Sequence, residues 1–121
     1  MKDVKDVMLF TQWAYFLPFG GKYMEFSNGL SKAEAERLYL LVEECGEIQQ
    51  LVGKILRHGY DSRWPRDGKT NRDRLNDEIG DFYVVYKMMC DNNDINVTKI
   101  WNRRQEKIQS IKQWLHFQED K

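Results

Sequence analysis

A chain of 121 residues with 41% hydrophobic and 31% charged residues suits one globular domain, residues 1–121, with a modest core. The formal net charge is +0, so no overall electric field attracts nucleic acid or a membrane surface, and we expect neither as a partner. No stretch approaches the ~20 consecutive apolar residues that a membrane-spanning helix needs.

The beginning of the chain predicts one helix followed by a loop. Residues 1–6 are too strongly charged for a signal peptide, and we therefore expect a cytoplasmic protein. Apolar side chains recur with helical spacing over residues 3–16, and Pro18 lies beyond the end of this segment. Residues 17–30 are rich in turn formers, which predicts a loop.

A long second helix is expected next. Ser31 and Glu34 have the spacing of a capping box, in which the serine accepts a hydrogen bond from the first turn and the glutamate bonds back to it. We expect this helix to end near His58, because Gly59 is a typical stop.

A polar loop, residues 60–70, separates the second helix from a third. Asn71 or Asp73 would cap the third helix, which we expect to run to about Cys90. The two cysteines, Cys45 and Cys90, fall on helical positions near apolar neighbours. This pattern predicts buried free thiols; the alternatives are a disulfide or a role in metal binding.

A fourth helix is expected at 97–117, capped by Asp94 or Asn96. Four helices with short connections predict an all-α fold, a four-helix bundle. Because the core of such a bundle is small and the chain is rich in aromatic residues, we expect a homodimer or homotetramer. The residues expected on the buried side of the fourth helix are Ile100, Trp101, Ile108, Ile111, Trp114 and Leu115.

The second helix carries acids on its apolar side. At ~100° per residue, Glu44 falls between Ile48 and Leu51, and Glu47 borders the same side one turn later. An unpaired buried carboxylate costs several kcal/mol, so these acids need a counter-charge. The apolar residues expected on this side are Leu38, Leu41, Val42, Cys45, Ile48, Val52, Ile55 and Leu56.

The third helix supplies a matching pair of acids, Glu78 and Asp81, on the side that carries Leu75, Ile79, Phe82, Val85, Tyr86 and Met89. If the two helices pack antiparallel, the four carboxylates converge. Two like charges ~4 Å apart repel by roughly 4 kcal/mol at an effective dielectric constant of about 20. A hard divalent cation removes this repulsion, and all-oxygen ligands suit Mg²⁺ or Mn²⁺. We therefore predict a metal site; the alternative is a misjudged helical phase that leaves the acids on the surface.

The residues around these acids resemble the two motifs of a known superfamily. Residues 43–48 read Glu-Glu-Cys-Gly-Glu-Ile and residues 77–82 read Asp-Glu-Ile-Gly-Asp-Phe, each with a glycine before its last acid. They resemble the all-α nucleoside triphosphate pyrophosphohydrolases, which include the MazG-like proteins, dimeric dUTPases, dCTP pyrophosphatase and phosphoribosyl-ATP pyrophosphohydrolase. The resemblance covers residues 38–86 well and the flanking helices loosely.

The resemblance implies an enzyme whose substrate is a nucleoside triphosphate. Water attacks the α-phosphorus and releases a nucleoside monophosphate and pyrophosphate, a reaction suited to cleaning the nucleotide pool. By the same resemblance, Glu44, Glu47, Glu78 and Asp81 are the Mg²⁺ ligands and catalytic residues, and one acid of the first motif orients or deprotonates the water. Such chemistry needs no protein nucleophile, and the chain has no Cys/His or Ser/His arrangement that would supply one.

Basic and amide side chains are the candidates for binding the phosphates. Lys54 lies two turns beyond Glu47 on nearly the same side of the second helix, although a solvated lysine is an equal alternative. The last helix carries a pattern that resembles the phosphate- or sugar-binding residues of the family, with a charged outer face as the alternative. That pattern consists of Lys99, Asn102, Arg103 and Lys107, of which we prefer Asn102 and Arg103.

Two tryptophans are candidates for stacking on the base. Trp13 belongs to the first helix and Trp64 to the loop at 60–70; the alternatives are a core position for Trp13 and simple loop closure for Trp64. His58, at the end of the second helix, is expected to act as a favourable C-terminal cation rather than as a catalytic base.

Two features depart from the family pattern. The 30 residues between Glu47 and Glu78 are at the long end, so residues 60–70 are a candidate substrate loop or inter-subunit arm. Gln50 stands where some relatives have another acid, which leaves open the number of metal ions.

Three alternatives stay open at this stage. One is phosphoribosyl-ATP hydrolysis with the same metal site. Another is a non-catalytic nucleotide-binding or regulatory bundle. A di-iron bundle is disfavoured, because it requires Glu-x-x-His pairs and neither His58 nor His116 follows a glutamate at that spacing.

Overall fold

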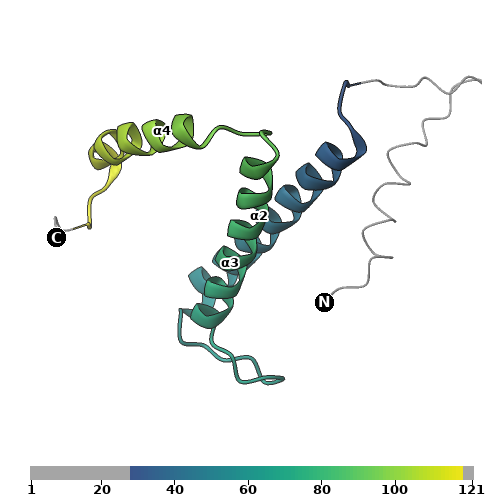
Figure 1. Ribbon diagram of the computed structural model, residues 1–121. Coiled ribbons are helices and arrows are strands. Elements are labelled where there is room, and N and C mark those ends of the chain that lie inside the picture. Colours follow the sequence, from purple (N-terminus) through teal and green to yellow (C-terminus); the bar gives the residue numbers. More distant parts are fainter. Residues whose placement is uncertain (1–27, 119–121) are drawn as a thin grey trace, which may run out of the picture.

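The computed structural model describes residues 28–118, and this part of the chain is all-helical (Figure 1). It consists of helix α2 (Lys32–His58), helix α3 (Asn71–Asp91), helix α4 (Val97–Ser110) and a short 3₁₀ helix, η1 (Ile111–Trp114). The helix predicted at 3–16 lies outside the described residues. Within 28–118, no helix combines the length and the hydropathy that crossing a lipid bilayer requires.

Helix α2 begins and ends where the local chemistry predicts. Ser31 Oγ accepts a hydrogen bond from the Glu34 amide at 3.1 Å, and Glu34 Oε2 accepts one from the Ser31 amide at 2.6 Å. These two bonds confirm the predicted capping box. The helix ends at His58, followed by Gly59 with φ 82°, a backbone conformation that only glycine adopts without strain.

The N-cap of helix α3 is neither of the two predicted caps. Thr70 is the N-cap: its hydroxyl accepts a hydrogen bond from the Asp73 amide at 3.0 Å, while Asp73 Oδ2 accepts one from the Thr70 amide at 2.9 Å. The prediction of Asn71 or Asp73 as the cap was therefore wrong, although Asp73 is the second member of the box. Asn71 has another role. It is only 2% exposed and donates from Nδ2 to the carbonyl oxygen of Gly59 at 2.9 Å, which ties the start of α3 to the end of α2.

Helices α2 and α3 pack antiparallel as a pair (Figure 1). The buried apolar side chains between them are Leu51, Val85 and Met89. At the end opposite the connecting loop, Arg37 of α2 donates two hydrogen bonds to Asp94, at 2.5 and 2.9 Å, and both side chains are largely buried. A bidentate charged pair of this kind is geometrically specific, so both ends of the helix pair are fixed.

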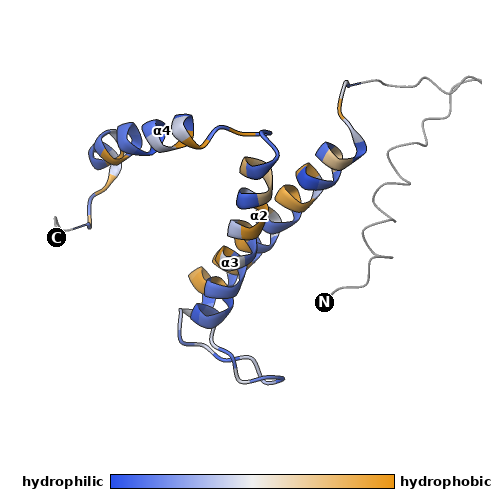
Figure 2. Cartoon of the chain, viewed as in Figure 1, coloured by the Kyte–Doolittle hydropathy of each residue, from blue (hydrophilic) through white to orange (hydrophobic). Residues whose placement is uncertain are grey.

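Several apolar residues that the helical wheel placed inside lie on the surface of the described part of the chain. Val42 is 71% and Leu56 82% exposed, and Leu38, Val52 and Ile79 are also exposed. Cys45 is exposed as well, so the prediction of a buried thiol there was wrong, whereas Cys90 is half-buried and both thiols are free. The reason is that the apolar stripe of α2 is wider than the area that α3 covers; Figure 2 marks the apolar residues along both helices.

Helix α4 leads away from the pair and packs closely against neither α2 nor α3 (Figure 1). Asn96 caps it, as predicted, by accepting from the Lys99 amide at 3.0 Å. The helix ends at Ser110 rather than at 117, because its last turns tighten into η1, a common way for a helix to end. None of its predicted inner residues is buried, and Trp114 is 73% exposed. Within residues 28–118, one chain therefore forms a helix pair with a projecting third helix.

Candidate metal centre and adjoining pocket

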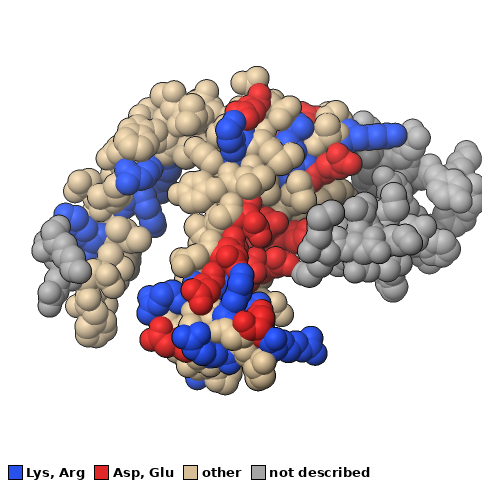
Figure 3. Space-filling view, turned by 60° about the horizontal axis from the view of Figure 1, so that its bottom comes forward, with Lys and Arg blue, Asp and Glu red and all other residues tan. Residues whose placement is uncertain are grey.

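Three glutamates from helices α2 and α3 converge on one face of the helix pair. Glu44 and Glu47 come from successive turns of α2, and Glu78 comes from the facing turn of α3. Each offers a carboxylate oxygen, and these oxygens lie within 4.8 Å of one another. Figure 3 shows acidic side chains gathered on this face, next to lysines and arginines at the loop end of the pair. We call the three residues the acidic cluster.

Asp81, the fourth predicted ligand, does not join the acidic cluster. It lies one turn beyond Glu78 on α3, and its side chain is exposed. Its negative charge is nevertheless close enough to raise the pKa of Glu78. The structure therefore brings together three of the four predicted acids, and Asp81 borders them.

The acidic cluster holds Glu78 in an unfavourable environment for a negative charge. The pKa of Glu78 is raised from the usual 4.5 to about 7, most of all by burial, and further by a hydrogen bond with Glu47 and by the charges of Glu47, Asp81 and Glu44. A hydrogen bond between two carboxyl groups requires that one of them carries a proton. The Oε2 atom of Glu78 is also buried without a hydrogen-bond partner among the described residues. Both features indicate that a positive charge at this point would stabilise the structure.

The acidic cluster fits a hard divalent cation. Its donors are all carboxylate oxygens, which suit Mg²⁺ or Mn²⁺ rather than the softer metals that thiolates and imidazoles bind. A cation would relieve the mutual repulsion of the three carboxylates and would give Glu78 Oε2 a partner. Glu44, Glu47 and Glu78 are the residues that would hold it.

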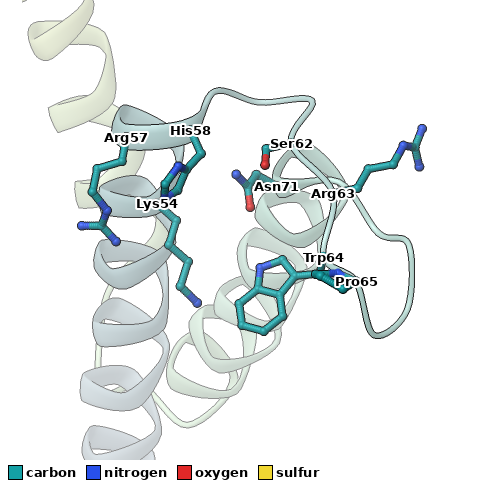
Figure 4. Close-up of a pocket in the computed structure, with 8 residues that line it drawn as sticks. All are labelled: Lys54, Arg57, His58, Ser62, Arg63, Trp64, Pro65 and Asn71. Carbon is teal, nitrogen blue, oxygen red and sulfur yellow. The ribbon is translucent and has the colours of Figure 1, made fainter.

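A pocket of about 300 Å³ lies at the loop end of the helix pair, which we call the loop-end pocket (Figure 4). The connection between α2 and α3 forms a tight hairpin, in which the Trp64 amide donates to the Lys69 carbonyl at 3.1 Å and the Gly68 amide to the Trp64 carbonyl at 3.0 Å. This hairpin carries Trp64 to one side of the pocket. The lining residues are Lys54, Arg57, His58, Ser62, Arg63, Trp64, Pro65 and Asn71.

The indole ring of Trp64 is already in contact with two cations. Lys54 Nζ lies 4.8 Å and the Arg74 guanidinium carbon 5.0 Å from the centre of the ring. Cation–π contacts of this kind restrict the long basic side chains to the neighbourhood of the ring. Trp64 therefore supports Lys54 and Arg74, and its predicted stacking on a base stays a prediction.

The loop-end pocket and the acidic cluster adjoin each other. Lys54 follows Glu47 by seven residues on α2, which places it on nearly the same side about 10 Å further along the axis. On α3, Arg74 precedes Glu78 by one turn. A ligand that reaches from the acidic cluster along the helix pair therefore meets Lys54 next.

The other predicted substrate residues lie elsewhere. Asn102 and Arg103 are exposed on α4, which does not pack on α2 or α3, and Arg103 pairs with Glu106 on its own helix at 3.0 Å. The structure does not bring them to the acidic cluster of the same chain. Trp13 lies outside the described residues.

Sequence reasoning missed Ser62, Asn71 and Arg74 as neighbours of the candidate site and gave His58 only a role at the helix end. One signal was present in the sequence. Residues 54–74 contain seven lysines and arginines but only three aspartates, although the whole chain is neutral. Such a local excess of positive charge next to an acidic motif indicates an anion-binding surface.

Comparisons with family models, with curated proteins and with solved structures find no match to this chain. The functional interpretation therefore depends on the residues themselves: the converging carboxylates, the basic loop-end pocket and the spacing between them.

Proposed function

We propose that the protein is a Mg²⁺-dependent nucleoside triphosphate pyrophosphohydrolase that cleaves a triphosphate to a monophosphate and pyrophosphate. The observation that carries the proposal is the convergence of Glu44, Glu47 and Glu78 from two motifs on antiparallel helices. The basic residues about 10 Å along the same helix pair supply the positive charge that a polyphosphate requires.

In this proposal the acidic cluster holds Mg²⁺, or Mn²⁺ in its place, and Asp81 completes the ligand set when its side chain turns inward. A cation held there would neutralise phosphate charge and lower the pKa of a water molecule bound to it. Glu44 or Glu47 orients the water and accepts its proton, because both belong to the first motif and to the acidic cluster that would hold the cation. Lys54 pairs with a phosphate oxygen further along the helix.

We further propose a homo-oligomer with bundle packing, in which α4 of one copy packs against the α2–α3 pair of another. Exposed apolar residues lie both on the α2–α3 pair, at Val42 and Tyr83, and on α4, at Trp101. Within one chain these surfaces are separated, whereas a second copy can cover both. In this arrangement Asn102 and Arg103 of one copy reach the phosphates bound at the acidic cluster of the next.

The rival function is a non-catalytic nucleotide-binding module. The observation that favours it is the position of Asp81 outside the acidic cluster, which leaves three carboxylates instead of four. A module of this kind would bind nucleotides with Mg²⁺ and release no product.

The decisive experiment measures pyrophosphate release from a panel of ribo- and deoxyribonucleoside triphosphates with Mg²⁺ and with EDTA. We expect metal-dependent release from at least one member of the panel. With EDTA we expect no release, because the acidic cluster without a cation repels the negatively charged triphosphate. Binding of nucleotides without release from any of them would favour the binding module. Release that persists in EDTA would contradict the metal site.

Mixing two inactive variants tests whether α4 acts on another copy. We expect Glu78→Gln and Arg103→Ala to be inactive or strongly impaired alone, but a re-equilibrated 1:1 mixture to recover about a quarter of the activity, because half of the dimers are mixed and each has one intact site. If Arg103 acted on its own chain, the mixture would recover nothing. A matched control, Arg104→Ala on the same helix, should keep its activity.

A further inference from the structure

The loop-end pocket contains cations that no carboxylate neutralises within the described residues. Lys69, Arg72 and Arg74 pair with Asp77, Asp61 and Asp67 in the surrounding surface. By contrast, over residues 28–118 no acidic side chain lies within ion-pair distance of three of the lining residues, Lys54, Arg57 and His58. The pocket therefore has a net positive charge available to a ligand.

The side chains do not contribute equally to the interior of the pocket. Figure 4 shows Lys54 extending from α2 toward the indole of Trp64, whereas Arg57 and Arg63 point away from the enclosed space. The cation–π contact at 4.8 Å holds the Lys54 ammonium at the pocket wall without using a carboxylate. Lys54 is therefore the central cation, and Trp64 is the residue that positions it.

Neutral hydrogen-bonding groups lie opposite Lys54. Ser62 and Asn71 point into the space between α2 and the hairpin (Figure 4). Asn71 is 2% exposed, and its bond to the Gly59 carbonyl oxygen fixes the orientation of the amide. Beside the pocket, Nε of Arg74 is buried without an acceptor among the described residues, which an oxygen of a bound anion would supply.

The volume of the pocket limits the size of its ligand. About 300 Å³ is at the lower end of the range of 300–1,000 Å³ that is typical for pockets of small molecules. Such a space holds a small oxyanion, whereas a whole nucleoside triphosphate would extend out of its open side.

We propose that the loop-end pocket is a pyrophosphate site, in which Lys54 pairs with the anion, Ser62 and Asn71 provide hydrogen bonds, and Trp64 positions Lys54. The assignment of this anion as the β- and γ-phosphates of a substrate rests on the proposed function. The affinity of the pocket for inorganic pyrophosphate does not, because the pocket binds it without a metal ion.

The experiment is a calorimetric titration of the full chain with inorganic pyrophosphate in EDTA. We expect saturable binding that weakens with salt, because charge pairing at an open pocket is screened by ions. Lys54→Met should weaken binding at least tenfold, which is about 1.4 kcal/mol. Trp64→Leu should also weaken pyrophosphate binding, because Lys54 is retained but is no longer held at the pocket wall. The matched control is Lys87→Met on α3, since Lys87 is an exposed lysine that pairs with Asp91; it should bind like the unchanged chain.

Three results would overturn the proposal: no saturable binding, equal binding by Lys54→Met, or equally tight binding of sulfate. Circular dichroism confirms that each variant is folded. If Lys54→Met does not fold, Ser62→Ala provides a second test at the pocket and should also weaken binding. Glu78→Gln separates this proposal from the enzymatic one, because it should bind pyrophosphate in EDTA at least as tightly as the unchanged chain. Binding of pyrophosphate without hydrolysis of any nucleotide would support the pyrophosphate site and contradict the proposed enzymatic activity. Hydrolysis of a nucleotide without binding of pyrophosphate would support the activity and contradict the site.

Discussion

Glu78→Gln should lower pyrophosphate release at least about 100-fold, since changing even the outer neighbours of metal ligands costs 10–100-fold. Glu78 is the only member of the acidic cluster that α3 contributes, so its loss leaves both remaining carboxylates on one helix. Glutamine keeps the size of the side chain but carries no charge. The measurement is the steady-state rate of pyrophosphate release at saturating Mg²⁺.

The matched control for this variant is Asp77→Asn, one residue earlier on α3. Asp77 is exposed and pairs with Lys69 at 2.7 Å, outside the acidic cluster. We expect this control to retain its activity within a few-fold and both variants to show the helical spectrum of the unchanged chain. Equal activity of Glu78→Gln and the unchanged chain would remove Glu78 from the site.

Without metal, the protein should become less stable as the pH rises from about 4.5 to about 7. The pKa of Glu78 is raised from 4.5 to about 7 in the folded state, so the folded chain binds more protons than the unfolded chain within this window. The ionisation of Glu78 therefore leaves the free energy of unfolding unchanged below pH 4.5. Above about pH 7 the whole cost of ionising this buried carboxyl group is subtracted from it. The measurement is the midpoint of thermal unfolding, Tm, in EDTA across this pH range.

Mg²⁺ should restore the stability that is lost at high pH. At pH 8 all three carboxylates are available as ligands, and Mg²⁺ at about 100 times its Kd should contribute about 2.7 kcal/mol. At pH 5 the proton on Glu78 competes with the metal, so the gain in Tm should be small. Glu78→Gln should flatten the pH dependence and reduce the gain. A gain in Tm that is equal at both pH values would contradict a site that depends on this carboxylate.

The beginnings and ends of helices were predictable where one short motif determines them. Ser31 with Glu34 and the glycine at 59 act through neighbours in the sequence, and so does Asn96. The start of α3 was misassigned because Thr70 stands directly before two other good capping residues, and local pattern alone does not rank them.

The acidic cluster was largely predictable, because helical periodicity places Glu44, Glu47 and Glu78 on facing sides of two helices. Periodicity does not determine the rotation of each helix finely enough to decide whether Asp81 turns inward or outward. The loop-end pocket was not predictable at all, because it depends on how a hairpin between the helices folds back and on the hydrogen bond between Asn71 and Gly59.

Which apolar residues are buried could not be predicted from the sequence either. A helical wheel shows that Val42 and Leu56 share the apolar side of α2, but it does not show which part of that side a neighbour covers. The same holds for Trp101 on α4, whose apolar side has no cover from α2 or α3.

One unbroken helix, α2, carries both Glu47 and Lys54. The helix therefore fixes the axial distance between these two residues. A ligand that contacts both side chains must span that distance. Inserting a single residue between Glu47 and Lys54 would lengthen their axial separation by only about 1.5 Å. It would also turn Lys54 by about 100° around the helix axis, away from the face that carries Glu47. The distance between the two side chains along the axis, and the face they share, are therefore set by the number of residues between them in α2.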